Sequence, residues 1–365
     1  MKISEISKLS LRKNSSSFNN VDKRLKFGIV GVGGGGSNAV FEAWKKLGSI
    51  SSLVDFVVIN TDIQALKKPG MKDIIKMLIG ESTTKGLGSG GKYEVGKAAA
   101  KESSEKIRKF IQGKHVIFLS AGLGGGTGSG AAPEVARIAK EEGVLVISFG
   151  TLPWRFEGAE RYKNALISNH ELGKVSDSLI LFDNESFLSG DKVSSNESLS
   201  DLFKEINDNF IRTIITLIDL VYDSSLINVD FNDIKSTLTN SGFALFNSIV
   251  FRDISLDAER TEKNITIIRE TFEQKFNSRL SILKKEELKI AKNIILNISG
   301  SEKILKMVLV KEIINGISKI TNDKIEYIFG VSHNEFLGDK IKISYLITGL
   351  NDPMKIEYEK LMDKK

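Results

Sequence analysis

Cysteine is absent from this chain of 365 residues, and histidine occurs at only three positions. The absence of cysteine excludes disulfides, thiolate metal sites and a cysteine nucleophile, and it fits a reducing compartment. His115, His170 and His333 lie far apart in the sequence. We therefore interpret each as an isolated packed or surface residue, and we expect neither a histidine-based zinc site nor a Ser-His-Asp triad.

Long apolar runs and blocks of like charge are also missing. No apolar run reaches about 18 residues, so no transmembrane helix is expected. The net charge is +6, from 52 basic and 46 acidic residues, and no block of like charge indicates a nucleic-acid surface. The first residues, MKISEISKLSLRKNSSSFNN, lack the apolar core of a signal peptide. Residues 1–24 are interpreted as a flexible N-terminal arm, with organelle targeting or a weak membrane contact as alternatives.

Short apolar runs rich in β-branched residues alternate with helical patterns from Leu25 onward. The runs are KFGIV, DFVVINTD, IIKMLIG, HVIFLSAG, VLVISFG and DSLILFD. Strands that are apolar on both faces and alternate with helices predict a parallel sheet covered on both sides, with right-handed crossovers. The sequence thus predicts an α/β, doubly wound domain over residues 25–195.

A second, smaller α/β domain is expected over residues 224–350. Between the two domains, apolar residues at spacings of three and four over residues 196–223 predict one long central helix. The second domain is predicted to hold strands at 293–300, 326–332 and 342–350, a helix near 302–319 and a charged helix from Asp257 to Phe276. Residues 351–365 are expected to form a short polar tail, either frayed or a short helix.

Three glycine-rich segments follow predicted strands: GVGGGG (31–36), GLGSGG (86–91) and GLGGGTGSG (122–130). In an open parallel sheet, ligands bind beyond the carboxyl ends of the strands, and glycine lets a phosphate approach the free N–H groups of a helix N-terminus. Three such loops predict a polyphosphate site. None contains G-K-[ST], so backbone amides, helix dipoles and an expected Mg²⁺ ion would hold the phosphates without a P-loop lysine. No side chain is assigned as a metal ligand.

A dinucleotide-dependent oxidoreductase is one alternative. Gly31, Gly33 and Gly36 satisfy G-x-G-x-x-G, and Asp62 ends the next strand 26 residues later. Two features oppose this alternative: a second, richer loop crowds the same edge, and no hydride-transfer constellation accompanies the motif.

The motif GGGTGSG resembles the tubulin signature, and the chain from about Lys26 to Leu350 is similar to the FtsZ family of bacterial tubulin homologues. The motifs GVGGGGSNAV, NTDIQAL, TKGLGSGGKYEVGKAA, LPWRFEGAER, INVDFNDIK, NISG, IFGV and ITGL follow in the family's order. The resemblance implies the tubulin/FtsZ fold, with a GTP-binding domain, a central helix and a C-terminal activation and polymerisation domain. It also implies a cytoplasmic GTPase that polymerises head to tail into a division ring at mid-cell, with division-ring proteins as partners.

The resemblance also assigns a site for GTP or GDP. The phosphates and the base edge would be lined by Gly34, Gly35, Gly36, Ser37 and Asn38. The β- and γ-phosphates would be held by Gly126, Thr127 and Gly128, next to Gly124 and Gly125, and covered by Gly88, Ser89 and Gly90. Glu157 and Arg161 would contact the ribose side. The guanine would be contacted by Asn184, Phe203 and Asn207. Asp62 is also counted among the nucleotide-binding residues. Taken singly, Phe203 is more typical of a core residue, the two asparagines of surface or cap residues, and Glu157 with Arg161 of an i,i+4 pair.

Asp230 and Asp233 carry the predicted catalysis. Two carboxylates three residues apart usually cap a helix, and that interpretation stays open here. The resemblance implies instead that this loop enters the nucleotide pocket of the next subunit, where the acids position or polarise the attacking water and Asn228 helps to place the loop. Because phosphoryl transfer depends mainly on positioning and charge stabilisation, a neighbouring subunit can supply half of the site.

Several positions depart from the family's pattern. Trp154 stands where the family usually has Phe, Asp183 where it often has Pro, and VYDSSLINVDF lacks the usual Pro-Gly. The chain also ends about 15 residues after ITGL, without the usual peptide that binds membrane anchors. We therefore expect either a shortened chain or a divergent paralogue, whose membrane contact is indirect or weak, through the N-terminal arm. A tubulin-like filament for DNA segregation or cell shape, and a non-hydrolysing nucleotide-binding regulator, remain as alternatives.

Overall fold

The computed structural model divides into two compact units, whose boundary lies inside one long helix. Of the described residues, those up to Ile211 and those from Asp352 onward belong to the N-terminal unit, and those of Arg212–Asn351 belong to the C-terminal unit. The structure describes residues 25–48, 53–67, 73–185, 198–222, 226–227, 229–252, 266, 270, 285–318, 321 and 324–363. The predicted N-terminal arm lies outside these residues, and the predicted domain boundaries stay predictions.

A parallel sheet forms the centre of the N-terminal unit. Its strand order is β3-β2-β1-β4-β5-β6, and every neighbouring pair is parallel. The strands are β1 (Phe27–Val32), β2 (Val54–Asn60), β3 (Ile74–Leu78), β4 (Val116–Gly122), β5 (Leu145–Leu152) and β6 (Ser178–Asp183). All residues of β1 are buried, as expected for a strand covered on both faces. The predicted α/β class is confirmed.

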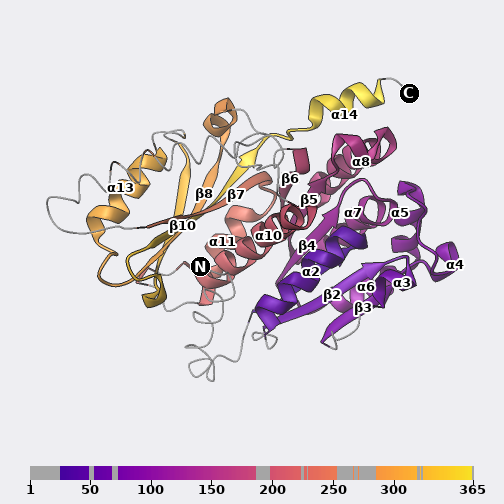
Figure 1. The fold of residues 1–365 in the computed structure, drawn as a ribbon, viewed down its shortest axis with the longest axis horizontal. Helices are drawn as coiled ribbons and strands as arrows, with labels where there is room; N and C mark the ends of the chain where they lie inside the picture. Colours follow the sequence, from indigo (N-terminus) through magenta and orange to yellow (C-terminus); the bar gives the residue numbers. More distant parts are fainter. Residues whose placement is uncertain are drawn as a thin grey trace. The chain divides into compact units, whose positions relative to one another are not determined.

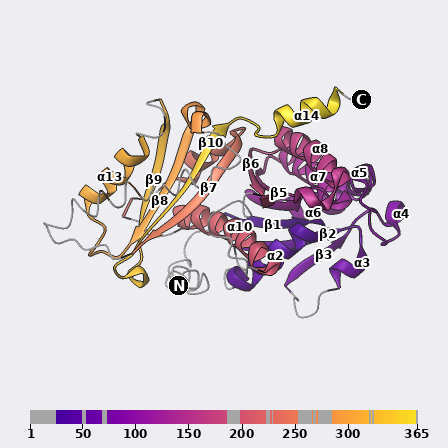
Figure 2. The same cartoon turned by 45° about the horizontal axis from the view of Figure 1, so that its top comes forward.

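Helices lie on both faces of this sheet (Figures 1 and 2). The helices of this unit are α2 (Gly33–Leu47), α3 (Ile63–Leu66), α4 (Glu81–Thr84), α5 (Tyr93–Glu102), α6 (Ser104–Ile111), α7 (Gly126–Glu141), the 3₁₀ helix η3 (Arg155–Glu157), α8 (Ala159–Val175) and α14 (Lys355–Met362), of which α14 lies against α8 rather than against the sheet. Glycine lets α5 and α7 approach closely, because a Cβ on Gly96 would clash with the carbonyl of Gly126 and one on Gly130 with that of Tyr93. This packing fixes the start of α7, where the richest glycine loop lies.

The long helix predicted from the apolar spacing is α10 (Leu199–Tyr222), with 24 residues. Ile206 and Phe210 lie on its buried side, and the Phe210 ring meets Phe149 of β5 edge-on, with 4.8 Å between ring centroids. No helix in the described ranges is long and apolar enough to span a bilayer.

The C-terminal unit is built on a four-strand arrangement, β7-β10-β8-β9. β10 runs antiparallel to β7 and β8, and β8 runs parallel to β9. The elements are α11 (Phe231–Leu238), β7 (Gly242–Phe251), the 3₁₀ helix η4 (Lys285–Ile290), β8 (Asn293–Gly300), α13 (Met307–Ser318), β9 (Glu326–His333), the 3₁₀ helix η5 (Glu335–Leu337) and β10 (Ile341–Leu350). The three strands and the helix expected from the sequence are present. The expected charged helix at 257–276 falls almost wholly outside the described residues.

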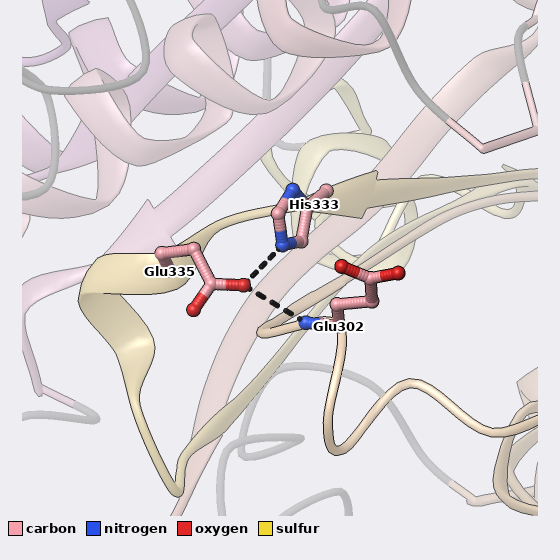
Figure 3. A group of neighbouring side chains, drawn as sticks. All are labelled: Glu302, His333 and Glu335. Atoms are coloured by element: carbon pink, nitrogen blue, oxygen red, sulfur yellow. Dashed lines mark hydrogen bonds and ion pairs between the residues drawn. The ribbon is translucent and has the colours of Figure 1, made fainter.

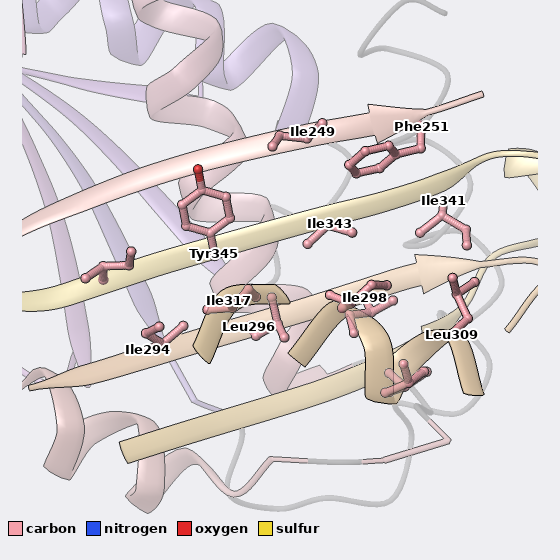
Figure 4. Packing of buried hydrophobic residues seen from close by; sticks show 14 of the residues in the cluster. Ile249, Phe251, Ile294, Leu296, Ile298, Leu309, Ile317, Ile341, Ile343 and Tyr345 are labelled. Carbon is pink, nitrogen blue, oxygen red and sulfur yellow. The ribbon is translucent and has the colours of Figure 1, made fainter. Parts of the chain in front are cut away.

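Side chains from β7, β8, β10 and α13 form the core of this unit (Figure 4). Leu296, Ile298 and Ile343 have no exposed surface, and Leu309 and Ile317 of α13 pack against the same cluster. The Tyr345 hydroxyl is kept inside this apolar layer by a hydrogen bond from the Asn247 amide, with 3.0 Å between Nδ2 and the hydroxyl oxygen. The apolar side chains of these strands thus form one buried face of the sheet, which α13 covers.

We predict that Leu296→Ala destabilises the protein by about 2–5 kcal/mol, because it leaves a cavity in a closed apolar layer. Leu226→Ala is the matched control, since Leu226 is 64% exposed. Denaturant unfolding measures both. Equal losses for the two variants would contradict this account of the core.

Candidate functional site

Two helices begin side by side at the end of the N-terminal sheet. β1 and β4 are neighbours with Val32 opposite Ala121, and each strand is followed by a helix, α2 from Gly33 and α7 from Gly126. A Cβ added at Gly33 would lie 2.8 Å from the backbone nitrogen of Gly128, so the two loops are in contact. This is the point where the strand order reverses, the usual ligand position in such sheets.

Neither helix has a side-chain cap at its N-terminus. The preceding residues are Val32 and Gly125, and neither first turn contains an acidic residue. The first N–H groups of a helix have no partner within the helix, and its dipole places about half a positive charge there. Two such ends in contact form a strong site for an anion such as a phosphate.

The glycines of these loops divide into two groups. A Cβ on Gly36, Gly126 or Gly128 would clash with neighbouring protein atoms, namely the Ser120 carbonyl, the Ser89 hydroxyl and the Gly122 carbonyl. By contrast, nothing lies within 4 Å of a Cβ built on Gly34, Gly90 or Gly125. The first group is required by the packing of the protein itself. The second group leaves room for a ligand to reach the backbone.

Three hydroxyl groups join the third glycine loop, 122–130, to the second, 86–91, and to the end of β2. Thr127 Oγ1 lies 2.6 Å from Thr61 Oγ1 and 3.1 Å from Ser89 Oγ, and all three residues are buried. The N–H of Gly88 also donates to the Thr61 carbonyl at 3.1 Å. The sequence reasoning missed Thr61, although its place beside Asp62 at the end of a strand was a usable signal.

The remaining phosphate-side residues surround this contact. Asp62 caps α3, accepting from the N–H of Gln64 at 2.8 Å. Gly35 and Asn38 are exposed on α2, whereas Ser37 is buried, and its hydroxyl has no hydrogen-bond partner in the described part of the chain. Gly124 has a φ of +121° and donates its N–H to the Ser129 hydroxyl at 2.7 Å.

Aromatic side chains gather beyond the end of β5. Trp154 is buried, and its ring lies 5.6 Å from that of Phe156 and 5.1 Å from that of Phe203. Phe203 is 48% exposed, so it is not the core residue that its type alone suggests. Asn207 is partly buried four residues further along α10. These rings offer an exposed apolar face on which a planar group can stack.

Polar groups flank the aromatic residues. The i,i+4 pair does form, between Arg161 and Glu157, and Glu157 also accepts from the N–H of Trp154 at 3.0 Å. Asn184 is 4% exposed, and its Oδ1 lacks a hydrogen-bond partner among the described residues. Burial raises the pKa of the neighbouring Asp183 carboxyl. A buried amide oxygen without a donor fits a ligand that supplies one.

The predicted catalytic acids belong to the C-terminal unit. Asp230 caps α11, accepting from the N–H of Asn232 at 2.9 Å, so the capping interpretation holds for this residue. Asp233 is exposed in the first turn of the same helix. Asn228 lies outside the described residues.

A second polar cluster in the C-terminal unit joins Glu302, His333 and Glu335 (Figure 3). One potential ligand atom from each lies within 4.8 Å of the others, and all three residues are exposed. Glu335 accepts from the N–H of Glu302 at 3.2 Å and pairs with the His333 ring, and these contacts lower the pKa of its carboxyl. His333 is therefore not the isolated residue that the sequence suggested, because it pairs with Glu335.

Comparison with known proteins identifies this architecture. Residues 26–190 match the GTPase domain of the Tubulin/FtsZ family. An empty FtsZ dimer from M. jannaschii is 31% identical, with a TM-score of 0.75, and the match covers 94% of this chain and 96% of that one. A GDP-bound CetZ1 monomer from Haloferax volcanii is 23% identical, with a TM-score of 0.72, covering 93% of this chain and 100% of that one.

A CetZ2 protofilament from Haloferax volcanii, bound to GTPγS, is 24% identical, with a TM-score of 0.73, and covers 93% of this chain and 99% of that one. The two CetZ matches show that the fold is shared. The FtsZ match and the match to the GTPase domain together show the family. The chain belongs to the Tubulin/FtsZ family, whose members are GTPases.

Proposed function

We propose that this protein is a filament-forming GTPase that binds GTP at the contact of α2 and α7. The observation that carries the proposal is the pair of uncapped helix N-termini with open glycines in front of them. Gly34 and Gly125 give phosphate oxygens access to backbone N–H groups, and Gly90 leaves the second glycine loop, 86–91, open to a ligand as well. The hydroxyls of Thr127 and Ser89 lie beside this space, while Gly35, Gly36, Gly88, Gly124 and Gly128 shape its walls.

The base is assigned to the aromatic side of the site. Phe203 offers its exposed ring for stacking, and Asn184 Oδ1 can accept a hydrogen bond from a ring N–H or amino group of guanine. Asn207 lies one helical turn after Phe203 and reaches the same side. Glu157 and Arg161 are assigned to the ribose, and Ser37 and Asn38 to the space between base and phosphates.

A Mg²⁺ ion is the expected counter-ion of the phosphates. Mg²⁺ prefers oxygen ligands and usually keeps several waters while it binds substrate phosphates. The phosphate-side loops offer hydroxyl oxygens at Thr61, Ser89 and Thr127, and the Asp62 carboxylate already caps α3. These residues fit an ion held mainly by phosphates and water, which neutralises charge on the transferred group.

Hydrolysis is assigned to Asp230 and Asp233 of the next subunit in a head-to-tail filament, with Asn228 helping to place them. The exposed carboxylate of Asp233 can accept a proton from, or orient, an attacking water. The similarity to an FtsZ dimer and to the fold of a CetZ2 protofilament supports assembly with copies of the same chain.

For the cellular role we propose a bacterial division ring in the cytoplasm at mid-cell, with division-ring proteins as partners. The chain is similar to FtsZ and shares the CetZ fold, so a tubulin-like filament with another task, in DNA segregation or cell shape, is the alternative. A fluorescent fusion in dividing cells distinguishes them, since only the division role requires a band at mid-cell. An oxidoreductase has no support from the family match.

We predict that Gly125→Ala weakens GTP binding about tenfold while leaving the melting temperature unchanged. The added methyl group meets no protein atom within 4 Å but occupies the space in front of α7. Isothermal titration with GTP measures the effect. Gly316→Ala is the control, because a Cβ on Gly316 of α13 likewise meets no atom within 4 Å, and this residue lies outside the proposed site. Equal affinities for the two variants would argue against this phosphate site.

We predict that Asp233→Ala lowers GTP hydrolysis at polymerising concentrations about 10²-fold or more, with GTP affinity retained. Phosphate release, measured over a range of protein concentrations, tests this, with Asn232→Ala as the control on the same exposed turn. Wild-type specific activity should rise with concentration, because the site is shared. An Asp233→Ala protein with undiminished hydrolysis would remove the acid from the mechanism.

A further inference from the structure

Helix α14, near the end of the chain, packs against α8 within the N-terminal unit. Asp352, just before α14, accepts hydrogen bonds from the Asn169 amide and from the N–H of Met354, both at 2.9 Å. The Tyr358 ring stacks on His170 of α8, with 3.8 Å between ring centroids and 19° between the planes. No residue of α14 is buried, so the helix is attached by polar and ring contacts rather than by an apolar core.

Glu357 of α14 contacts two residues that neighbour the candidate nucleotide site in the sequence. Its carboxylate accepts from the Tyr162 hydroxyl at 2.5 Å and pairs with the Arg155 guanidinium at 3.4 Å. The same guanidinium lies over the Tyr162 ring, 4.0 Å from its centroid. Burial and the hydrogen bond to Glu357 raise the pKa of Tyr162, so its hydroxyl stays protonated and donates at neutral pH.

Arg155 is the link between this contact and the site, because it begins the 3₁₀ helix η3. Its backbone N–H donates to the Glu185 carboxylate at 2.7 Å, next to Asn184. Trp154 precedes it, and Phe156 and Glu157 follow it. The side chain of Arg155 is thus held by Glu357 of α14, and its backbone is held by Glu185. Together these two contacts hold the segment that carries the aromatic rings and the proposed ribose contact.

We propose that Glu357 is a positioning residue for nucleotide binding. It holds segment 153–158 in its binding arrangement through Arg155 and Tyr162, and it touches no part of the nucleotide itself. This inference rests on the proposed GTP site, and it adds a role for α14 that none of the glycine motifs implies. The contact joins residues 202 positions apart in the sequence.

The test compares Glu357→Ala with Glu359→Ala in the full chain. Both variants remove one negative charge from α14, but Glu359 is exposed and pairs only loosely with Lys355, at 3.9 Å. We expect Glu357→Ala to raise the Kd for GDP about fivefold, the size of one lost charged contact near the surface, and Glu359→Ala to leave it unchanged. Tyr162→Phe should raise the Kd as well, and combining it with Glu357→Ala should add little, because both act through one contact.

Hydrogen–deuterium exchange without nucleotide separates this inference from the proposed function. Segment 153–158 should exchange faster in Glu357→Ala than in Glu359→Ala, while the strands of the sheet exchange at the wild-type rate. If wild-type protein binds no guanine nucleotide, the proposed function is wrong, and the exchange rates still decide whether Glu357 orders the segment. Equal exchange and equal Kd in the two variants would overturn the inference. So would faster exchange across the whole sheet, which would indicate a general loss of stability.

Discussion

The contact between the N-termini of α2 and α7 is the constraint on which the site depends. The parallel register of β1 and β4 brings both helix starts to one point of the sheet edge. Each start carries about half a positive charge, and neither has an acidic residue or a side-chain cap to offset it. Two like partial charges in contact are unfavourable, and an anion in front of them removes the repulsion. The fold therefore maintains an arrangement whose electrostatics are completed by a phosphate.

The glycines at this contact have two different roles, and the sequence alone does not distinguish them. Gly36, Gly126 and Gly128 are needed because protein atoms occupy the place of a side chain. Gly34 and Gly125 are open, so their missing side chains matter only to a molecule that approaches from outside. The loop 122–130 is thus partly a packing device for α5 and α7 and partly a binding surface, and a motif search treats both parts alike.

Much of the fold followed from periodicity alone. Six strands of the N-terminal sheet and the long helix α10 have strong local patterns, and the structure contains them all. The strand β7 was not named beforehand, although its sequence GFALFNSIVF is largely apolar. Two contacts between distant segments left no local signal: His333 with Glu302, and α14 with α8. The sequence also carried no signal for the exposure of Phe203, which distinguishes this ring from a core ring and is the basis for proposing that it stacks on a base.

The distribution of carboxylates gives a physical reason for a shared catalytic site. Within the residues assigned to the nucleotide, the carboxylates are Asp62 and Glu157, and both already accept hydrogen bonds, from Gln64 and from Trp154 and Arg161. Because both carboxylates already accept these hydrogen bonds, neither is well placed to activate a water molecule. The exposed Asp233 belongs to the other unit, at the start of α11. If the proposed phosphate site lies in one unit, and an acid whose carboxylate has no hydrogen bond among the described residues lies on the other, hydrolysis can depend on a second copy, as proposed above.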